Sequence, residues 1–260
     1  MRKSAIIMPL LALIAGAAGF SLRLREIADV FGGNLAGLAE RGAPITLALI
    51  ALSAAVLLMC LIFALVASSK RKSSGEFEEA FGTDTIAYPI IFSALGIVWL
   101  GATVKYLINA SASGAFPLMD LYFVVLSALA AVSVIFFAVE VFQDPRCKSK
   151  FPLSVVPSLF MCFWLILMYR DNAANPVLLS YAYQCLAIIT SALGFYFTSG
   201  FVFSKAAPGK TIFFYLASVF FCFVTLADDI PVGIKIIFAA IICLNLVHSS
   251  MLIRNLRRAQ

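Results

Sequence analysis

The chain carries few charges and a single histidine, and both shortages exclude classes of protein. Charged residues make up 12% of the 260 positions, about half the share typical of a soluble domain. One histidine excludes the HExxH zinc motif, which needs two, and neither a P-loop nor a GxGxxG turn occurs. The six cysteines form no CxxC pair. The sequence therefore predicts no metal site, no cofactor and no catalytic residue.

Apolar residues dominate what is present. They fill 63% of the positions, and the mean hydropathy is +1.03. In a bilayer every backbone polar group must be paired within the protein, which leaves helices or closed barrels. The run at 124–139 lacks the alternation of a barrel strand. These features predict an all-α, polytopic integral membrane helical bundle in contact with the lipid bilayer.

Eight stretches are long enough to cross a membrane, for which about 17–25 residues are needed. We expect one transmembrane domain over residues 1–260, arranged as four in–out–in hairpins. The predicted spans are 4–22, 44–67, 87–108, 117–143, 151–169, 176–204, 211–227 and 230–253. Each even-numbered span starts at or beside a proline, a residue favoured in the first helical turn.

The first span has an alternative interpretation. Basic residues, an apolar run and the small residues at 15–17 also fit a cleaved signal peptide, which would leave seven spans. The uncharged stretch 4–22 is longer than the usual signal core of about 7–15 residues. This length favours a retained helix.

The distribution of cations predicts the orientation. With the N-terminus inside, 13 of the 19 Lys and Arg residues fall on the cytoplasmic side and 6 on the other. The positive-inside rule then places both termini in the cytoplasm of a multi-pass cell-membrane protein. Because the net charge of +6 comes from these short clusters between apolar runs, it does not indicate nucleic-acid binding.

Residues 24–42, before the second span, place apolar side chains at three- and four-residue spacing. This pattern predicts an amphipathic helix on the outer interface.

Two groups of polar residues near the span ends need an explanation. Asp120, Lys235 and Arg170 fall at similar depths near the outer surface, where we expect Asp120 to pair with Lys235 or Arg170 around a vestibule. Snorkelling of these charges to the headgroups is the alternative. Near the inner surface, Glu140, Asn245 and His248 are candidates for a polar group that carries a proton. An interface anchor is the alternative for the histidine.

The sixth span is the best candidate for a lining helix. Ser180, Gln184, Ser191 and Thr198 recur at spacings of four and seven, with Tyr181 and Tyr183 beside them. The amide of Gln184 needs partners in an apolar surrounding. Helix packing explains the hydroxyl residues equally well. We expect Gln184, Tyr181, Tyr183 and Ser180 to face a ligand or water.

Three functions remain open from the sequence. A transporter or channel for a small polar solute fits the polar stripe and the hairpin pattern. A non-transporting sensor or assembly subunit fits the sparse charge and short loops. A lipid-modifying intramembrane enzyme comes third, because no acid, base and nucleophile set is evident. A polar cavity reaching Gln184 favours transport, whereas a dry interior favours a structural role.

Overall fold

The computed structural model describes residues 2–31, 43–72, 77–83, 85–112, 117–142, 152–175 and 177–258. Within these ranges the chain forms α-helices, short 3-10 and π turns, and two strands of two residues each. The α-helices are α1 Arg2–Glu26, α2 Pro44–Lys70, α3 Phe77–Phe81, α4 Ala87–Ala112, α5 Leu118–Phe142, α6 Val156–Asp171, α7 Ala182–Val202, α8 Pro208–Thr225 and α9 Val232–Asn255. The short elements are η1 Ile27–Phe31, β1 Arg71–Lys72, η2 Pro152–Val155, η3 Leu178–Ser180 and β2 Arg257–Arg258.

Eight helices in the described part are long and apolar enough to cross a membrane, as the sequence predicts. They are all the α-helices above except the five-residue α3. The all-α polytopic bundle is therefore confirmed, and the protein is a multi-pass membrane protein whose outer helix faces contact lipid.

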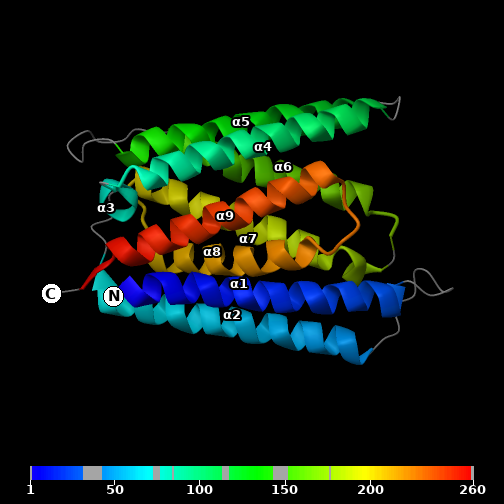
Figure 1. The fold of residues 1–260 in the computed structure, drawn as a ribbon, viewed down its shortest axis with the longest axis horizontal. Coiled ribbons are helices and arrows are strands. Elements are labelled where there is room, and N and C mark those ends of the chain that lie inside the picture. The colour runs from blue at the N-terminus through cyan, green and yellow to red at the C-terminus, as the bar shows by residue number, and fades with distance from the viewer. Residues whose placement is uncertain are drawn as a thin grey trace.

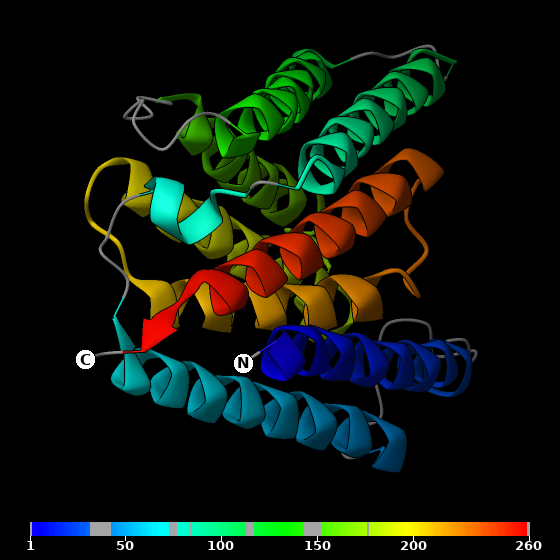
Figure 2. The same ribbon diagram turned by 60° about the vertical axis from the view of Figure 1, so that its left-hand side comes forward.

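The helices pack in three groups (Figures 1 and 2). The hairpin of α1 and α2 covers one side, and the hairpin of α4 and α5 covers the other. Between them lie α6, α7, α8 and α9, where α8 packs on α1, α7 and α9, and α9 also packs on α4. The most buried spans are α8 and α9, each with 67% of its most apolar window inside the protein. The centre of the bundle is thus built from the C-terminal half of the chain.

Two glycines allow the α4 backbone to approach its neighbours. A Cβ on Gly96 of α4 would lie 2.5 Å from Ile135 Cγ1 of α5. A Cβ on Gly233 of α9 would lie 2.9 Å from the carbonyl oxygen of Ala102 and 3.0 Å from the amide nitrogen of Tyr106, both on α4. Small residues at helix crossings are typical of membrane bundles. They hold α5 and α9 close to α4 on either side.

The two ends of the bundle are distinct. The start of α1 and the end of α9 lie at one end, here called the termini end, and the loop 226–231 between α8 and α9 lies at the opposite, far end (Figure 1). At the termini end, β1 pairs antiparallel with β2, Arg71 opposite Arg258 and Lys72 opposite Arg257. This pairing brings four basic residues together at the ends of α2 and α9.

Several predicted boundaries differ from the structure, two of them in kind. The sixth span does not begin at residue 176: η3 comes first and α7 starts at Ala182, because Tyr181 (φ −125°, ψ 1°) interrupts the helix. Residues 24–31 do not begin a separate interfacial helix either. They continue α1 through Glu26 and then form the π turn η1. The rest of the predicted interfacial helix, 32–42, lies outside the described residues.

Candidate functional site

A cavity of about 210 Å³ opens at the far end, between five helices. Gln184 of α7, Asp120 of α5 and Tyr106 of α4 contribute polar side chains to its wall. Asp171 and Asn172 contribute two more from the end of α6. The remaining lining is apolar or aromatic and comprises Phe123, Trp164, Leu167, Met168, Ile230, Pro231 and Ile234. The cavity therefore offers a few polar groups above an aromatic floor, the usual composition of a small-molecule site.

The charges around this cavity are arranged differently from the prediction. Asp120 is half-buried and accepts a hydrogen bond of 3.4 Å from the Tyr106 hydroxyl. It forms no ion pair with Lys235 or Arg170, although all three side chains are described. The guanidinium of Arg170 instead pairs with its exposed neighbour Asp171 at 2.7 Å. The predicted ion pair is wrong because Arg170 finds a carboxylate one residue away on its own helix.

Of the four predicted lining residues on the sixth span, only Gln184 lines this cavity. Ser180 lies in η3, where its hydroxyl donates to the Val177 carbonyl at 2.7 Å. Tyr181 packs against the apolar core. Tyr183 is buried on another side of α7, where its ring lies 5.2 Å from the Arg23 guanidinium. The three residues therefore do not form one surface with Gln184.

Five aromatic rings form the floor of the cavity and the layer beneath it, here called the aromatic layer. They are Trp99 of α4, Phe123 of α5, Phe160 and Trp164 of α6, and Phe238 of α9. Neighbouring ring centroids lie 4.7–5.8 Å apart, the range of favourable aromatic pairs. The indole Nε1 of Trp99 donates to Ser127 Oγ at 3.0 Å, so its one polar atom is satisfied. Phe123 and Trp164 line the far-end cavity, and the other three rings pack against them.

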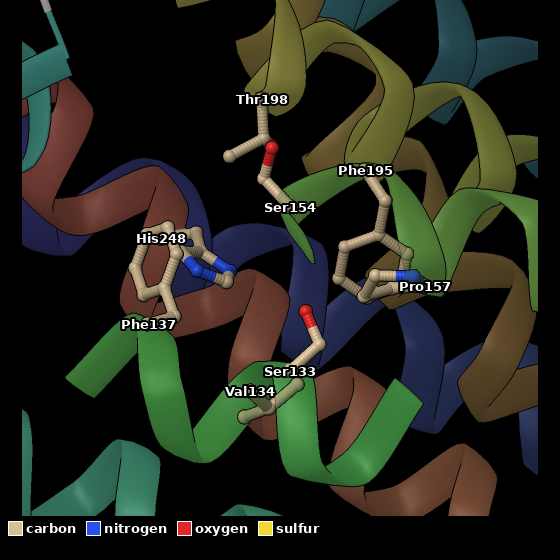
Figure 3. A pocket seen from close by; sticks show the side chains of 8 residues that line it. All are labelled: Ser133, Val134, Phe137, Ser154, Pro157, Phe195, Thr198 and His248. Carbon is tan, nitrogen blue, oxygen red and sulfur yellow. The ribbon is translucent and has the colours of Figure 1, made fainter. Parts of the chain in front are cut away.

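A second, much smaller cavity lies in the termini half. Figure 3 shows the side chains that line it. Its volume is about 20 Å³, and it is lined by Ser133, Val134 and Phe137 of α5, Ser154 of η2, Pro157 of α6, Phe195 and Thr198 of α7, and His248 of α9. The same four helices, α5, α6, α7 and α9, thus line both cavities. We call the contact between these four helices the seam.

Two of the three residues of the predicted inner polar group have described side chains, and these two have different surroundings. Asn245 and His248 are both buried on α9, but they face different partners. Asn245 Nδ2 donates to Ser218 Oγ of α8 at 2.8 Å, and Ser218 shares a 2.7 Å hydrogen bond with Ser191 of α7. His248 lines the small cavity instead. The Glu140 side chain lies outside the described residues. Asn245 therefore belongs to a hydrogen-bonded group with Ser218 and Ser191, and His248 does not.

A buried charged cluster at the far end was missed by sequence reasoning. Arg23 of α1 is 1% exposed, and its Nε and Nη1 donate to Asp228 Oδ1 and Glu26 Oε2, both at 2.7 Å. Nη1 also donates to the backbone carbonyl of Leu179, and Nη2 donates to that of Ser180. Burial raises the pKa of the Asp228 carboxyl, while the Arg23 guanidinium acts in the opposite direction. The cluster joins α1, η3 and the α8–α9 loop.

The only signal for this cluster in the sequence is the three-residue spacing of Arg23 and Glu26 at the end of an apolar run. Asp228 lies 205 positions away, and no local pattern connects it to Arg23. The hydrogen bonds of Arg23 attach the far end of α1 to η3 and to the α8–α9 loop.

A third cavity, of about 680 Å³, lies between α2, α7 and α8. Among the described residues that line it, only Ser68 and Lys210 carry strongly polar side chains, and the others are apolar or aromatic. Such a lining suits an acyl chain better than a polar solute. The far-end cavity is therefore the stronger candidate site.

Comparison with protein-family models, characterised proteins and solved structures finds no match for this chain.

Proposed function

We propose that the protein transports a small polar solute along the seam. The observation that supports this most strongly is the placement of two cavities with polar groups on the same four helices, with a single aromatic layer between them. Transporters typically bind their substrate between helices and then open the site to the other side. A cavity open at the far end and closed below by rings fits one state of such a cycle.

The lining favours a solute that carries a positive charge or hydrogen-bond donors. Asp120 supplies a carboxylate, and Gln184 supplies an amide that can donate and accept. Phe123 and Trp164 present rings in the same cavity, and aromatic faces attract cations. At about 210 Å³, the cavity is smaller than a typical drug-sized site of about 300–1,000 Å³. A small organic cation is the class of solute that fits best.

The orientation follows from the cations. Because β1 and β2 gather four basic residues at the termini end, we infer that this end faces the cytoplasm. The protein then lies in the cell membrane with both termini inside. The far-end cavity opens to the outside, where it can receive a solute from the medium.

A ligand sensor is the second candidate, and the aromatic layer favours it. Five packed rings close the seam below the cavity, so a solute could bind there without passing through. A sensor and a transporter differ in one measurable property: both bind the solute, but only a transporter moves it across a bilayer.

Uptake into vesicles that contain only the purified protein tests the proposal. Radiolabelled methylammonium, urea and acetate serve as cationic, neutral and anionic probes. We expect uptake of methylammonium above protein-free vesicles, and a fall of about fivefold to tenfold in Gln184→Leu, which removes the amide from the cavity. The matched control is Asn109→Leu, because Asn109 is an exposed amide at the far end of α4. Binding of methylammonium without uptake would favour the sensor instead.

A further inference from the structure

The small cavity beneath the aromatic layer is lined by polar atoms that lack partners. Neither ring nitrogen of His248 has a hydrogen-bond partner among the described residues, and the same holds for the Ser154 hydroxyl. The Leu244 carbonyl, one turn earlier on α9, is close to the imidazole but outside hydrogen-bond geometry. His248 is 4% exposed and Ser154 is 6% exposed. Both residues line the same cavity (Figure 3).

Unpaired polar atoms at this depth are costly, because no bulk solvent reaches them. Native proteins usually satisfy such groups with an ordered water. A cavity must offer about 10–15 Å³ to hold one water molecule, and this one offers about 20 Å³. The cavity therefore has room for a water molecule.

The chemistry of the two residues matches a water as well. A neutral imidazole has one donor and one acceptor nitrogen, and a serine hydroxyl can both donate and accept. Ser133 and Thr198 line the cavity too, but their hydroxyls already donate to the carbonyls of Leu153 at 2.6 Å and Gly194 at 2.8 Å. Among the described lining residues, His248 and Ser154 are the ones whose polar side-chain atoms have no hydrogen-bond partner.

Aromatic rings close the rest of the surroundings of His248. Phe81, Phe92 and Phe137 lie with centroids 4.8–5.9 Å from the imidazole, and Tyr215 stacks on it at 5.3 Å. The Tyr215 hydroxyl is hydrogen-bonded to Thr198. Among the described side chains no carboxylate or cation reaches the imidazole. Among the described residues no side chain is hydrogen-bonded to its nitrogens.

We propose that His248 and Ser154 bind one water molecule in this cavity, and that the pair is the inner polar site of the seam. The water site stands on the cavity alone. The role as inner site rests on the proposed function: when the aromatic layer opens, the hydrogen-bonding group of the solute replaces the water between His248 and Ser154.

Because the chain has a single histidine, isotope labelling of histidine reports on this site alone. The full chain is purified with a tag that contains no histidine, reconstituted in lipid bilayers and labelled with ¹⁵N-histidine. Solid-state NMR then measures magnetisation transfer from water protons to the imidazole nitrogens. We expect transfer from a slowly exchanging water in the unmodified chain. Its absence there would overturn the proposal.

Two variants and a matched control sharpen the test. Ser154→Val removes the hydroxyl and fills the cavity, so the water signal should disappear. Ser250→Val is the control, because it makes the same change two residues from His248. The Ser250 hydroxyl donates to the Val247 carbonyl, and Ser250 lines another cavity. The water signal should persist in this variant. If Ser154→Val does not fold, Ser154→Ala should weaken the signal by about fivefold, because one hydrogen bond is lost. An unchanged signal in either Ser154 variant contradicts the site.

His248→Phe separates the inner site from the proposed function. It replaces the imidazole by a ring of similar shape in an aromatic surrounding. We expect methylammonium to bind the far-end cavity with unchanged affinity while uptake falls by about tenfold. Unchanged uptake would refute the inner-site role and leave transport standing. If the unmodified chain neither binds nor takes up methylammonium, the proposed function is refuted. The NMR result on the water would remain valid in that case.

Discussion

The Arg23 guanidinium donates a 2.7 Å hydrogen bond to Asp228, and the two residues are 205 positions apart in the chain. The same guanidinium holds Glu26, which is fully buried. Two carboxylates thus depend on one arginine in a place that water does not reach, and one oxygen of each, Glu26 Oε1 and Asp228 Oδ2, has no hydrogen-bond partner among the described residues. This relationship makes the far end of α1 sensitive to any change of the arginine.

Arg23→Met should destabilise the protein strongly. The methionine keeps much of the side-chain volume but leaves two buried carboxylates without their counter-ion, a change that costs about 3–5 kcal/mol. Thermal unfolding in lipid nanodiscs measures the effect. Arg25→Met is the control, because Arg25 is exposed two residues later on the same helix. Equal melting temperatures for the two variants would show that the cluster adds no stability.

The stability should also depend on pH through Asp228. Its pKa in the folded protein is raised by burial, above the unfolded value of about 3.9. Between these two values the folded state binds more protons than the unfolded state, so stability falls as the pH rises from about 4 through the folded pKa. Asp228→Asn should flatten the change of stability with pH. The control is Asp229→Asn, which alters an exposed neighbour and should leave the pH dependence unchanged. A slope that steepens in Asp228→Asn would contradict the assignment.

The preference for cations should depend on Asp120. Asp120→Asn keeps the shape of the cavity and removes its half-buried carboxylate. We expect methylammonium binding to weaken by about tenfold, because a hydrogen bond to a charged group contributes about 1.5–3 kcal/mol. Competition of unlabelled methylammonium against the labelled probe measures the change. Asp229→Asn serves again as control, since Asp229 lies at the same end but does not line the cavity.

The aromatic layer should act as the barrier between the cavities. Phe160 is fully buried and contacts the rings of Trp99, Phe123 and Trp164. Phe160→Ala should cost about 3–5 kcal/mol of stability and raise the osmotic water permeability of vesicles, measured by stopped-flow light scattering. Phe136→Ala on the exposed face of α5 should change neither. A folded Phe160→Ala protein with unchanged water permeability would show that the layer does not close a path.

The helices could be predicted from the sequence because hydropathy is a local property of each run. Pro44 and Pro231 also marked the starts of α2 and α9 correctly to within a residue. The start of α7 could not be predicted from the proline at 176, because Asn175 and Ser180 form hydrogen bonds that build a 3-10 turn instead. Local side-chain bonds of this kind compete with the helix and leave no trace in hydropathy.

The site was predictable only in part. An amide in an apolar run needs a partner, and Gln184 lines a cavity; its contact with a ligand stays a prediction. The pairing of Arg23 with Asp228 and the shared cavity of His248 with Ser154 arise from contacts between distant segments. No spacing within one helix reports such contacts, so neither could be read from the sequence.

The seam hypothesis is tested most directly by reagent access to the two cavities. Three single-cysteine variants are made in a chain without its native cysteines. Gln184→Cys places a thiol in the far-end cavity, and Ser133→Cys places one in the small cavity. Ile189→Cys places one on the exposed face of α7. A charged, membrane-impermeant thiol reagent should label Gln184→Cys from the far end, with protection by methylammonium, and should not label Ile189→Cys. It should reach Ser133→Cys from the termini end only while methylammonium is being exchanged. Failure to reach Ser133→Cys under any condition would contradict a path along the seam.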